Sequence, residues 1–173
     1  FNFPAVLSLS TWADGIATVK YKSEKTNPNI SVLGADENYL TTAGYSIDKG
    51  RNFSVTEIEN AANVVIIGSE VALKIFKKEN PIDKIISVNN AKYRVIGTLK
   101  EKGTSIGFGG DKICILPYIN VKQLYGNERS WTTTVNVNNI QQLDEAVAEA
   151  TGIFRVIRKD AVGYESSFEI TKS

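Results

Sequence analysis

The stretch from Val64 to Gly97 decides the fold of this chain, and it reads VVIIGSEVALKIFKKENPIDKIISVNNAKYRVIG. Its first four residues are apolar without alternation, which is typical of a strand covered on both faces. Ser69 is placed to cap the helix that follows, and the apolar residues of that helix share one stripe, namely Ala72, Ile75 and Phe76. Asn89-Asn90 predicts a tight hairpin, because asparagine tolerates left-handed backbone.

Upstream of that stretch, the sequence predicts short strands and helices joined by polar turns. Asp14-Gly15 lies between two strand-like runs and predicts a hairpin between them. Asp36 is placed to cap a brief helix that Gly44 ends. Ser54 and Glu57 have the spacing of a capping box, which predicts a second short helix.

Downstream, the sequence predicts a strand, a helix and a second strand. Apolar and polar residues alternate from Trp131 to Val137, as in a half-buried strand. Asn139 with Gln142 predicts the start of a helix with one apolar face, which Gly152 should end. Residues 154–157 are then expected to return as a strand and to complete a right-handed βαβ unit.

These elements predict an α+β fold in two parts. Residues 1–50 and 131–173 read as layers of strands and helices, and we expect them to form one discontinuous α/β subdomain. Residues 51–130 are a run of short strands and turns, expected to form a smaller, inserted β-rich subdomain. A chain of 173 residues can bury roughly 70% of its unfolded surface, which is enough for a core without disulfides.

The composition excludes several classes of function. With 20 basic and 19 acidic side chains, the chain offers no broad basic field for nucleic acid. Cys114 is the single cysteine, so no internal disulfide can form. It lies in an apolar, strand-like run, where we expect a buried, inert thiol rather than a reactive nucleophile.

The sequence gives little support to catalysis. It contains no histidine, the commonest general base and metal ligand. The densest acidic groups suit helix caps or solvated helix faces, and they are Asp36-Glu37, Glu57 with Glu59, and Glu145 with Glu149. We therefore expect no catalytic, cofactor-binding or metal-binding residue and no enzyme activity. A hydrolase that uses two converging carboxylates is the alternative.

The glycine-rich segment from Gly103 to Gly110 is the candidate contact site. It lacks the Gly-Lys-Ser/Thr of a phosphate-binding P-loop, so a long flexible connection is the simpler interpretation. Ile106 and Phe108 are apolar residues on this polar loop, and they suit contact with a partner or a hydrophobic cargo. The same two side chains could equally fold back into the core.

The order of these motifs resembles the extracytoplasmic domain of MacB- and FtsX-type ABC transporter permeases. In that family a Gly-Arg-x-Phe lead, here Gly50, Arg51 and Phe53, precedes an apolar strand that ends in Gly. A helix, a Pro-Ile-Gly-Lys turn and a strand ending in Val-Ile-Gly-Val follow. Lys77 and Asp83 stand where the family has glycine, which puts the geometry of two turns in doubt. For Arg51 we expect a structural salt bridge.

The resemblance implies a porter-like subdomain built from both chain ends, and a function within a larger machine. Cytoplasmic ATP hydrolysis would move membrane helices, and this non-catalytic domain would couple that motion to a periplasmic partner or export cargo. Expected partners are an adaptor, a protein, small-molecule or lipoprotein cargo, and a second copy of the permease, but not nucleic acid. No cofactor is expected here, because ATP would bind elsewhere in the transporter.

The resemblance also implies a location. We expect an extracytoplasmic, periplasmic domain of a bacterial inner-membrane protein. The chain starts at Phe1 without an initiator methionine or leader, and no apolar run approaches the ~20 residues that cross a bilayer. We therefore expect a fragment whose flanking membrane helices lie outside it. A stand-alone extracytoplasmic ligand-binding or sensor domain is the alternative, and it would need an apolar pocket of at least ~300 Å³.

Overall fold

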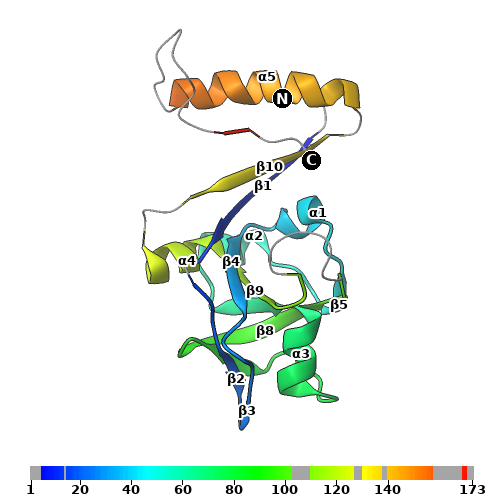
Figure 1. The fold of residues 1–173 in the computed structure, drawn as a ribbon, viewed down its shortest axis with the longest axis vertical. Coiled ribbons are helices and arrows are strands. Elements are labelled where there is room, and N and C mark those ends of the chain that lie inside the picture. The colour runs from blue at the N-terminus through cyan, green and yellow to red at the C-terminus, as the bar shows by residue number, and fades with distance from the viewer. Residues whose placement is uncertain are drawn as a thin grey trace. The chain divides into compact units, whose positions relative to one another are not determined.

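The computed structural model describes residues 5–13, 15–102, 110–126, 130–137, 140–157 and 169–170. Strands and helices are mixed along the chain, which confirms the α+β class (Figure 1). The strands are β1 (Ala5–Trp12), β2 (Val19–Tyr21), β3 (Glu24–Lys25), β4 (Ser31–Ala35), β5 (Ile47–Gly50), β6 (Val64–Ile67), β7 (Ile85–Val88), β8 (Ala91–Leu99), β9 (Ile113–Pro117) and β10 (Thr132–Val137). The helices are α1 (Tyr39–Ala43), α2 (Val55–Glu59), α3 (Ser69–Phe76), α4 (Tyr118–Tyr125) and α5 (Ile140–Ile157).

One mixed sheet connects the strands in the order β10-β1-β4-β9-β6-β8-β7-β2-β3, and β5 pairs separately with β8. The pairs β4–β9 and β6–β8 are parallel. The pairs β1–β4, β2–β3, β2–β7, β5–β8, β6–β9 and β7–β8 are antiparallel. Strands far apart in the sequence are therefore direct neighbours, because β4 lies beside β9 and β6 between β9 and β8.

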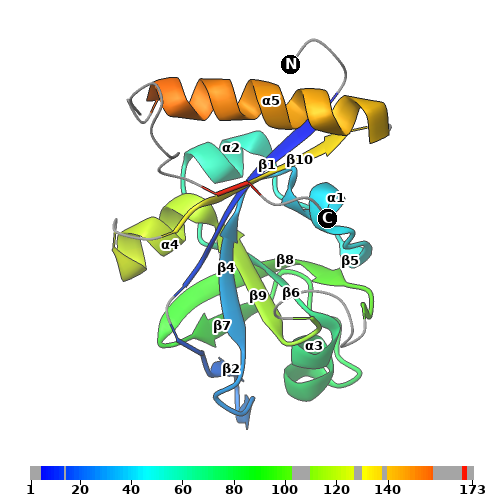
Figure 2. The same ribbon diagram turned by 45° about the horizontal axis from the view of Figure 1, so that its top comes forward.

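Strand β6 lies at the centre of the core, as its unbroken apolar run predicts. All four of its residues are buried. Val65 and Ile67 pack into one apolar cluster, together with residues of α3 and α4. Val64 and Ile66 pack into a second cluster, with Leu40 of α1 and Ile58 of α2. The helices thus cover both faces of the sheet (Figure 2).

A bulge in β8 places Leu99 on the face opposite Tyr93 and Val95, where strict alternation would not put it. Val65 pairs with Val95, but the next residue of β6, Ile66, pairs with Gly97. The extra residue, Ile96, moves the following side chains to the opposite face. Tyr93 and Val95 therefore belong to the first cluster, whereas Ile96 and Leu99 belong to the second.

Two turn predictions are confirmed and two caps are corrected. The N-cap of α1 is Asn38 and not Asp36. Asn89 and Asn90 join β7 to β8 with φ of 47° and 70°, the left-handed values of a type I′ hairpin. Gly44 ends α1 in the left-handed conformation. Ser69 is not a cap but the first residue of α3. Gly68 is the N-cap, where a Cβ atom would lie 2.3 Å from the carbonyl oxygen of Asp111.

The predicted hairpin at Asp14-Gly15 is wrong. β1 pairs antiparallel with β4, whereas β2 pairs with β3 and β7. Gly15 does have a left-handed φ of 77°, but the chain beyond it continues to a bridge between Ala17 and Ile30. Asp14 itself lies outside the described residues. The Asp-Gly pair therefore predicted a change of chain direction correctly, but it did not predict which strand pairs with β1.

The predicted βαβ unit at the end of the chain is also wrong. Helix α5 continues through Gly152 to Ile157, so residues 154–157 are helical and not a strand. A glycine inside a helix costs only about 1 kcal/mol relative to alanine, which the remaining turns of an 18-residue helix can offset. Asn139, the predicted cap of this helix, lies outside the described residues.

The chain divides into two compact units. One consists of Phe1–Val6 and Val135–Ser173, and the other is Leu7–Thr134. The second unit holds both apolar clusters. The predicted division into 1–50 with 131–173 and an inserted 51–130 uses different limits, and it stays a prediction. No helix in the described ranges is long and apolar enough to cross a membrane.

Both departures from the family pattern lie at residues with left-handed backbone. Lys77 ends α3 with φ 56° and ψ −108°, and Asp83 has φ 66°. L-residues rarely adopt such angles, whereas glycine does so readily. The turns therefore keep the backbone that a glycine would favour, at a cost of the order of 1–3 kcal/mol for each strained residue.

Replacing Lys77 with glycine should accordingly stabilise the domain. The loss of strain outweighs the exposed ion pair between Lys77 and Glu24, and we expect the free energy of unfolding to rise by about 1 kcal/mol. Urea denaturation measures this. Lys78→Gly is the matched control: Lys78 has no left-handed φ, so its replacement should lower stability by about 0.5–1 kcal/mol. Equal losses in both variants would contradict the strain argument.

Candidate functional site

The predicted contact residues, Ile106 and Phe108, lie outside the described residues, so their role stays a prediction. The structure does describe both ends of their loop. On one side, the backbone N–H of Lys102 donates to Oδ1 of Asp111 at 2.7 Å. On the other, the hydroxyl of Tyr45 donates to the carbonyl of Gly110 at 3.0 Å. We call Tyr45, Lys102 and Asp111 the loop anchor.

The ammonium group of Lys102 completes this anchor. It lies 3.9 Å from the centre of the Tyr45 ring, a cation–π contact, and it donates to the carbonyl of Ala43 at the end of α1. Burial lowers the pKa of Lys102, and the nearby carboxylate of Asp111 opposes that shift. Burial also raises the pKa of Tyr45. The loop therefore leaves and re-enters the fold at two adjacent, fixed points.

The backbone of Asp111 is held as firmly as its side chain. Its carbonyl accepts the N–H of Glu70, in the first turn of α3, at 3.2 Å. Asp111 is only 8% exposed. Sequence reasoning identified the glycines of the loop but missed the anchor, because Tyr45 is distant in sequence and no local spacing links it to Lys102.

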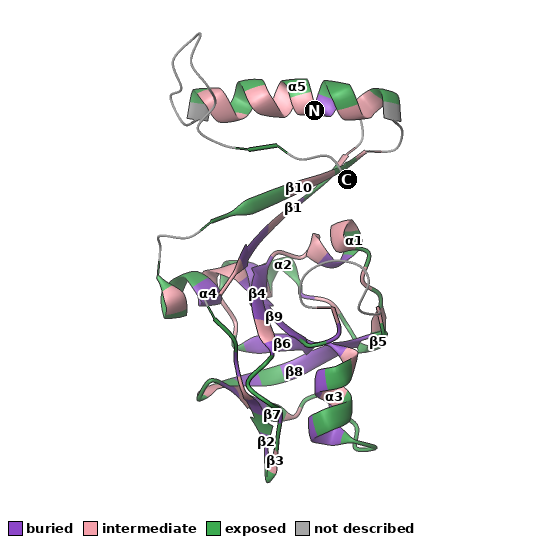
Figure 3. Ribbon diagram, viewed as in Figure 1, coloured by how far each residue is buried: buried purple, intermediate pink, exposed green. Residues whose placement is uncertain are grey.

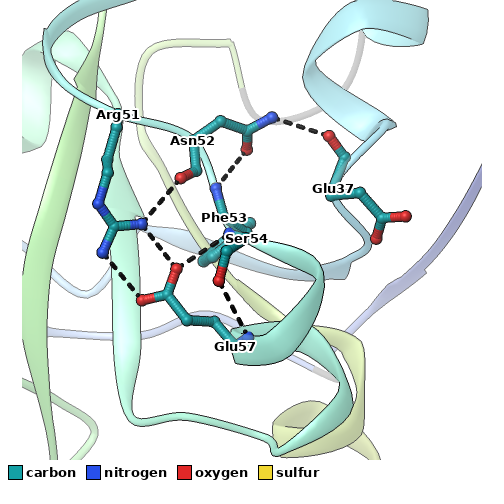
Figure 4. A network of polar contacts seen from close by, with 6 residues as sticks. All are labelled: Glu37, Arg51, Asn52, Phe53, Ser54 and Glu57. Carbon is teal, nitrogen blue, oxygen red and sulfur yellow. Dashed lines mark hydrogen bonds and ion pairs between the residues drawn. The ribbon is translucent and has the colours of Figure 1, made fainter.

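The Gly-Arg-x-Phe motif forms a polar network before α2, shown in Figure 4. Arg51 donates two hydrogen bonds to the carboxylate of Glu57, at 2.6 and 3.1 Å. Glu57 also accepts the N–H of Ser54, whose hydroxyl accepts the N–H of Glu57. The predicted capping box and the predicted salt bridge of Arg51 are both confirmed.

Asn52 and Phe53 extend the motif in opposite directions. The side-chain amide of Asn52 donates to the carbonyl of Glu37 at 2.8 Å, which ties the chain before α1 to the chain before α2 (Figure 4). Phe53 is buried in the second apolar cluster. Every side chain of this motif thus has an architectural partner.

The glycines of the motif permit a close approach between two backbones. Gly50 pairs with Gly97 where β5 meets β8. A Cβ atom on Gly50 would lie 2.1 Å from the carbonyl oxygen of Ile96, and one on Gly97 would lie 2.5 Å from that of Arg51. Side chains cannot fit at either position without a backbone shift. Gly50 and Gly97, which belong to two separate motifs of the sequence, therefore lie in one contact between β5 and β8.

Cys114, Asp36 and the acidic side chains are the remaining groups that the sequence singled out. Cys114 is buried, as predicted, and its burial raises the pKa of the thiol to about 12, which leaves it protonated and unreactive. Asp36 accepts hydrogen bonds from the N–H groups of Leu9 and Asn38. Within the described ranges, no group of three acidic, histidine or cysteine side chains could hold a metal ion.

The surface hollows in the described part of Leu7–Thr134 include a larger and a smaller one. The larger, of about 470 Å³, is lined by residues at the open end of the β2–β3 hairpin and at the Asn89-Asn90 turn, all of them polar except Pro28. The smaller, of about 170 Å³, lies between α3 and the strands β5 and β8 and contains two carboxylates, Asp48 and Glu79. Glu79 accepts the hydroxyl of Tyr21 and lies near Lys22 and Lys84.

Solved structures of other proteins share the fold of this chain. The periplasmic region of MacB from Actinobacillus actinomycetemcomitans superposes with a TM-score of 0.72 at 18% identity, over 87% of this chain and 67% of that one. The extracellular domain of the ABC-type transporter YknZ gives a TM-score of 0.68 at 22% identity, over 87% and 75%. These likenesses show the fold, that of extracytoplasmic transporter domains.

The sequence then gives the family. The MacB-like periplasmic core domain matches residues 2–153, and the chain belongs to that family. It is therefore an extracytoplasmic domain of the MacB/FtsX type, as its motifs predicted.

Full-length relatives share part of their sequence with this chain. The macrolide export ATP-binding/permease protein MacB of Chlorobaculum tepidum is 29% identical over 145 residues, 83% of this chain and 22% of that protein. The pyoverdine export ATP-binding/permease protein PvdT of Pseudomonas syringae is 28% identical over 122 residues, 67% and 19%. The chain spans about a fifth of the length of these relatives.

The ion pair of Glu57 predicts a pH dependence. The hydrogen bonds from Arg51 lower the pKa of Glu57 to about 2, against the opposing effect of burial. A carboxyl group whose pKa is lowered by folding stabilises the fold above its unfolded value, here 4.5, and loses that contribution as the pH falls toward 2.

Glu57→Gln should therefore destabilise the domain by about 0.5–1 kcal/mol near neutral pH, since Arg51 is half exposed and glutamine can keep the cap. The difference from the wild type should shrink as the pH falls from about 7 to about 3. Urea denaturation at several pH values measures it. Glu59→Gln, an exposed change on the same helix, should have little effect at any pH. A constant difference for Glu57→Gln would exclude the ion pair as its cause.

Proposed function

We propose that this chain is the non-catalytic extracytoplasmic part of an ABC transporter permease, and that it couples ATP-driven movement of membrane helices to a periplasmic partner or cargo. The family match over residues 2–153 carries this proposal. The relatives named as export ATP-binding/permease proteins support the transport context. ATP would bind in a part of the transporter other than this chain, and a second copy of the permease would complete the assembly.

The loop anchor supports a role for the loop from Gly103 to Gly109. Tyr45, Lys102 and Asp111 fix both ends of this loop to the sheet and to α1. A partner that contacts Ile106 or Phe108 would thus act on a loop whose two ends are held to the core. Force from that contact could pass through the loop anchor into the core. We propose these two side chains as the partner contact.

The alternatives have weaker support. A ligand sensor would need an apolar pocket, but the larger described hollow is lined by lysine, threonine and asparagine side chains and one proline. A hydrolase would need two free carboxylates in a cleft. The smaller hollow holds Asp48 and Glu79, but Glu79 is already engaged by Tyr21 and two lysines. Hydrolytic activity of the isolated chain that is lost in Asp48→Asn would favour the hydrolase.

Phe108→Ser tests the proposed contact. If Phe108 serves a partner, the isolated domain should keep its thermal stability, whereas the full-length transporter should lose partner crosslinking or export. Crosslinking from a photoreactive residue at position 108 in cells measures the contact directly. Phe53→Ser is the control, because Phe53 is a core residue whose loss should cost about 3–5 kcal/mol. A similar loss of stability for Phe108→Ser would show a core role and contradict the proposal.

A further inference from the structure

Three lysines lie in one row across the end of the sheet. The strand registers pair Lys25 of β3 with Lys20 of β2, Lys20 with Ser87 of β7, and Ser87 with Lys92 of β8. Residues paired in this way point to the same face of a sheet. We call Lys25, Lys20, Ser87 and Lys92 the basic row.

The basic row is open to solvent. Its three lysines are exposed, as is Arg94, two residues beyond Lys92 on the same face. This is the face that carries the second apolar cluster, with α1 and α2, over β4, β9 and β6. The green segments of β2, β3 and β8 in Figure 3 show the exposed residues at this end of the sheet. The helices therefore leave one end of this face uncovered, and its charges are basic.

The charges of the basic row are not balanced within the described residues. None of its lysines lies within 4 Å of a described carboxylate, although five other ion pairs of that kind occur. Glu24, next to Lys25 in the chain, points to the other face and pairs with Lys77 at 3.0 Å. Like charges placed directly opposite each other destabilise a sheet. The pair Lys20–Lys25 therefore lowers stability, and no described ion pair of either lysine offsets that cost.

The larger surface hollow lies at one end of the basic row. It measures about 470 Å³, and no acidic side chain lines it. Its lining offers ammonium, amide and hydroxyl groups, from Thr18, Lys20, Lys25, Thr26, Asn27, Pro28, Asn89 and Asn90. Some of these groups are already used, since Asn89 Oδ1 accepts the N–H of Thr18 and Thr26 Oγ1 accepts that of Val19. The ammonium groups of Lys20 and Lys25 remain available to a ligand.

We propose that the hollow and the basic row bind a linear ligand that carries phosphate groups. Lysine binds phosphate as a compact point charge, and the amide and hydroxyl groups of the hollow can add hydrogen bonds to phosphate oxygens. The row is one residue wide and spans three strand spacings, about 14 Å. These dimensions suit a linear molecule rather than a flat membrane surface. The net charge of +1 gives no field that would draw the whole domain to an anionic surface.

Calorimetric titration of the chain with sodium tripolyphosphate at low ionic strength tests the proposal. The double variant Lys20→Ala/Lys25→Ala should lose at least about tenfold in affinity, because it removes two charged contacts. The matched control is Lys74→Ala/Lys78→Ala, which removes two exposed lysines elsewhere, on and just after α3, and should bind as the wild type does. The first variant should not melt at a lower temperature, because it removes a repulsive pair.

Two further probes separate the possible sources of the charge. Citrate should bind more weakly than tripolyphosphate, and vesicles of equal parts phosphatidylglycerol and phosphatidylethanolamine should not bind the domain in a Lys20-dependent way. Tripolyphosphate binding that both double variants weaken equally would overturn the proposal. So would an absence of binding, equal binding of citrate, or Lys20-dependent binding to vesicles alone. These outcomes are independent of the coupling function, which the Phe108 variant tests.

Discussion

The burial of β6 on both faces is the constraint on which the rest of this structure depends. Its four apolar residues divide between two clusters, one covered by α3 and α4 and the other mainly by α1 and α2. Burial of such side chains provides about 1.5–3 kcal/mol each, and it is the main source of stability for a domain without disulfides. The parallel pairing with β8 and the antiparallel pairing with β9 follow from placing this strand centrally, because no backbone group of a buried strand can be left unpaired.

Around that core, polar contacts fix the segments that the apolar clusters do not hold. The Arg51 network joins the start of α2 to the chain before α1, and the paired glycines bring β5 against β8. The loop anchor does the same for the ends of the Gly103–Gly109 loop. These contacts hold surface segments of the domain against its core, as the proposed coupling function would require.

Much of the fold could be predicted locally. β6, the Asn89-Asn90 hairpin, the capping box of α2 and the end of α1 at Gly44 all follow from residues within a few positions of one another. The contacts of the candidate site were harder to predict from the sequence. The partner of Arg51 was within reach because Glu57 is six residues away, but no spacing joins Tyr45 to Lys102, and the basic row requires the registers of four strands.

The sequence by itself determined the family, the buried strand and the turns, because apolar periodicity and backbone preferences act over a few residues. Only the tertiary structure decided which strands pair, and with them the partner of β1, the bulge at Ile96 and the row of lysines. It also carried α5 through Gly152. The physical reason is that strand pairing is a non-local choice. The same alternating segment can pair with several others, and the burial of the whole sheet selects among them.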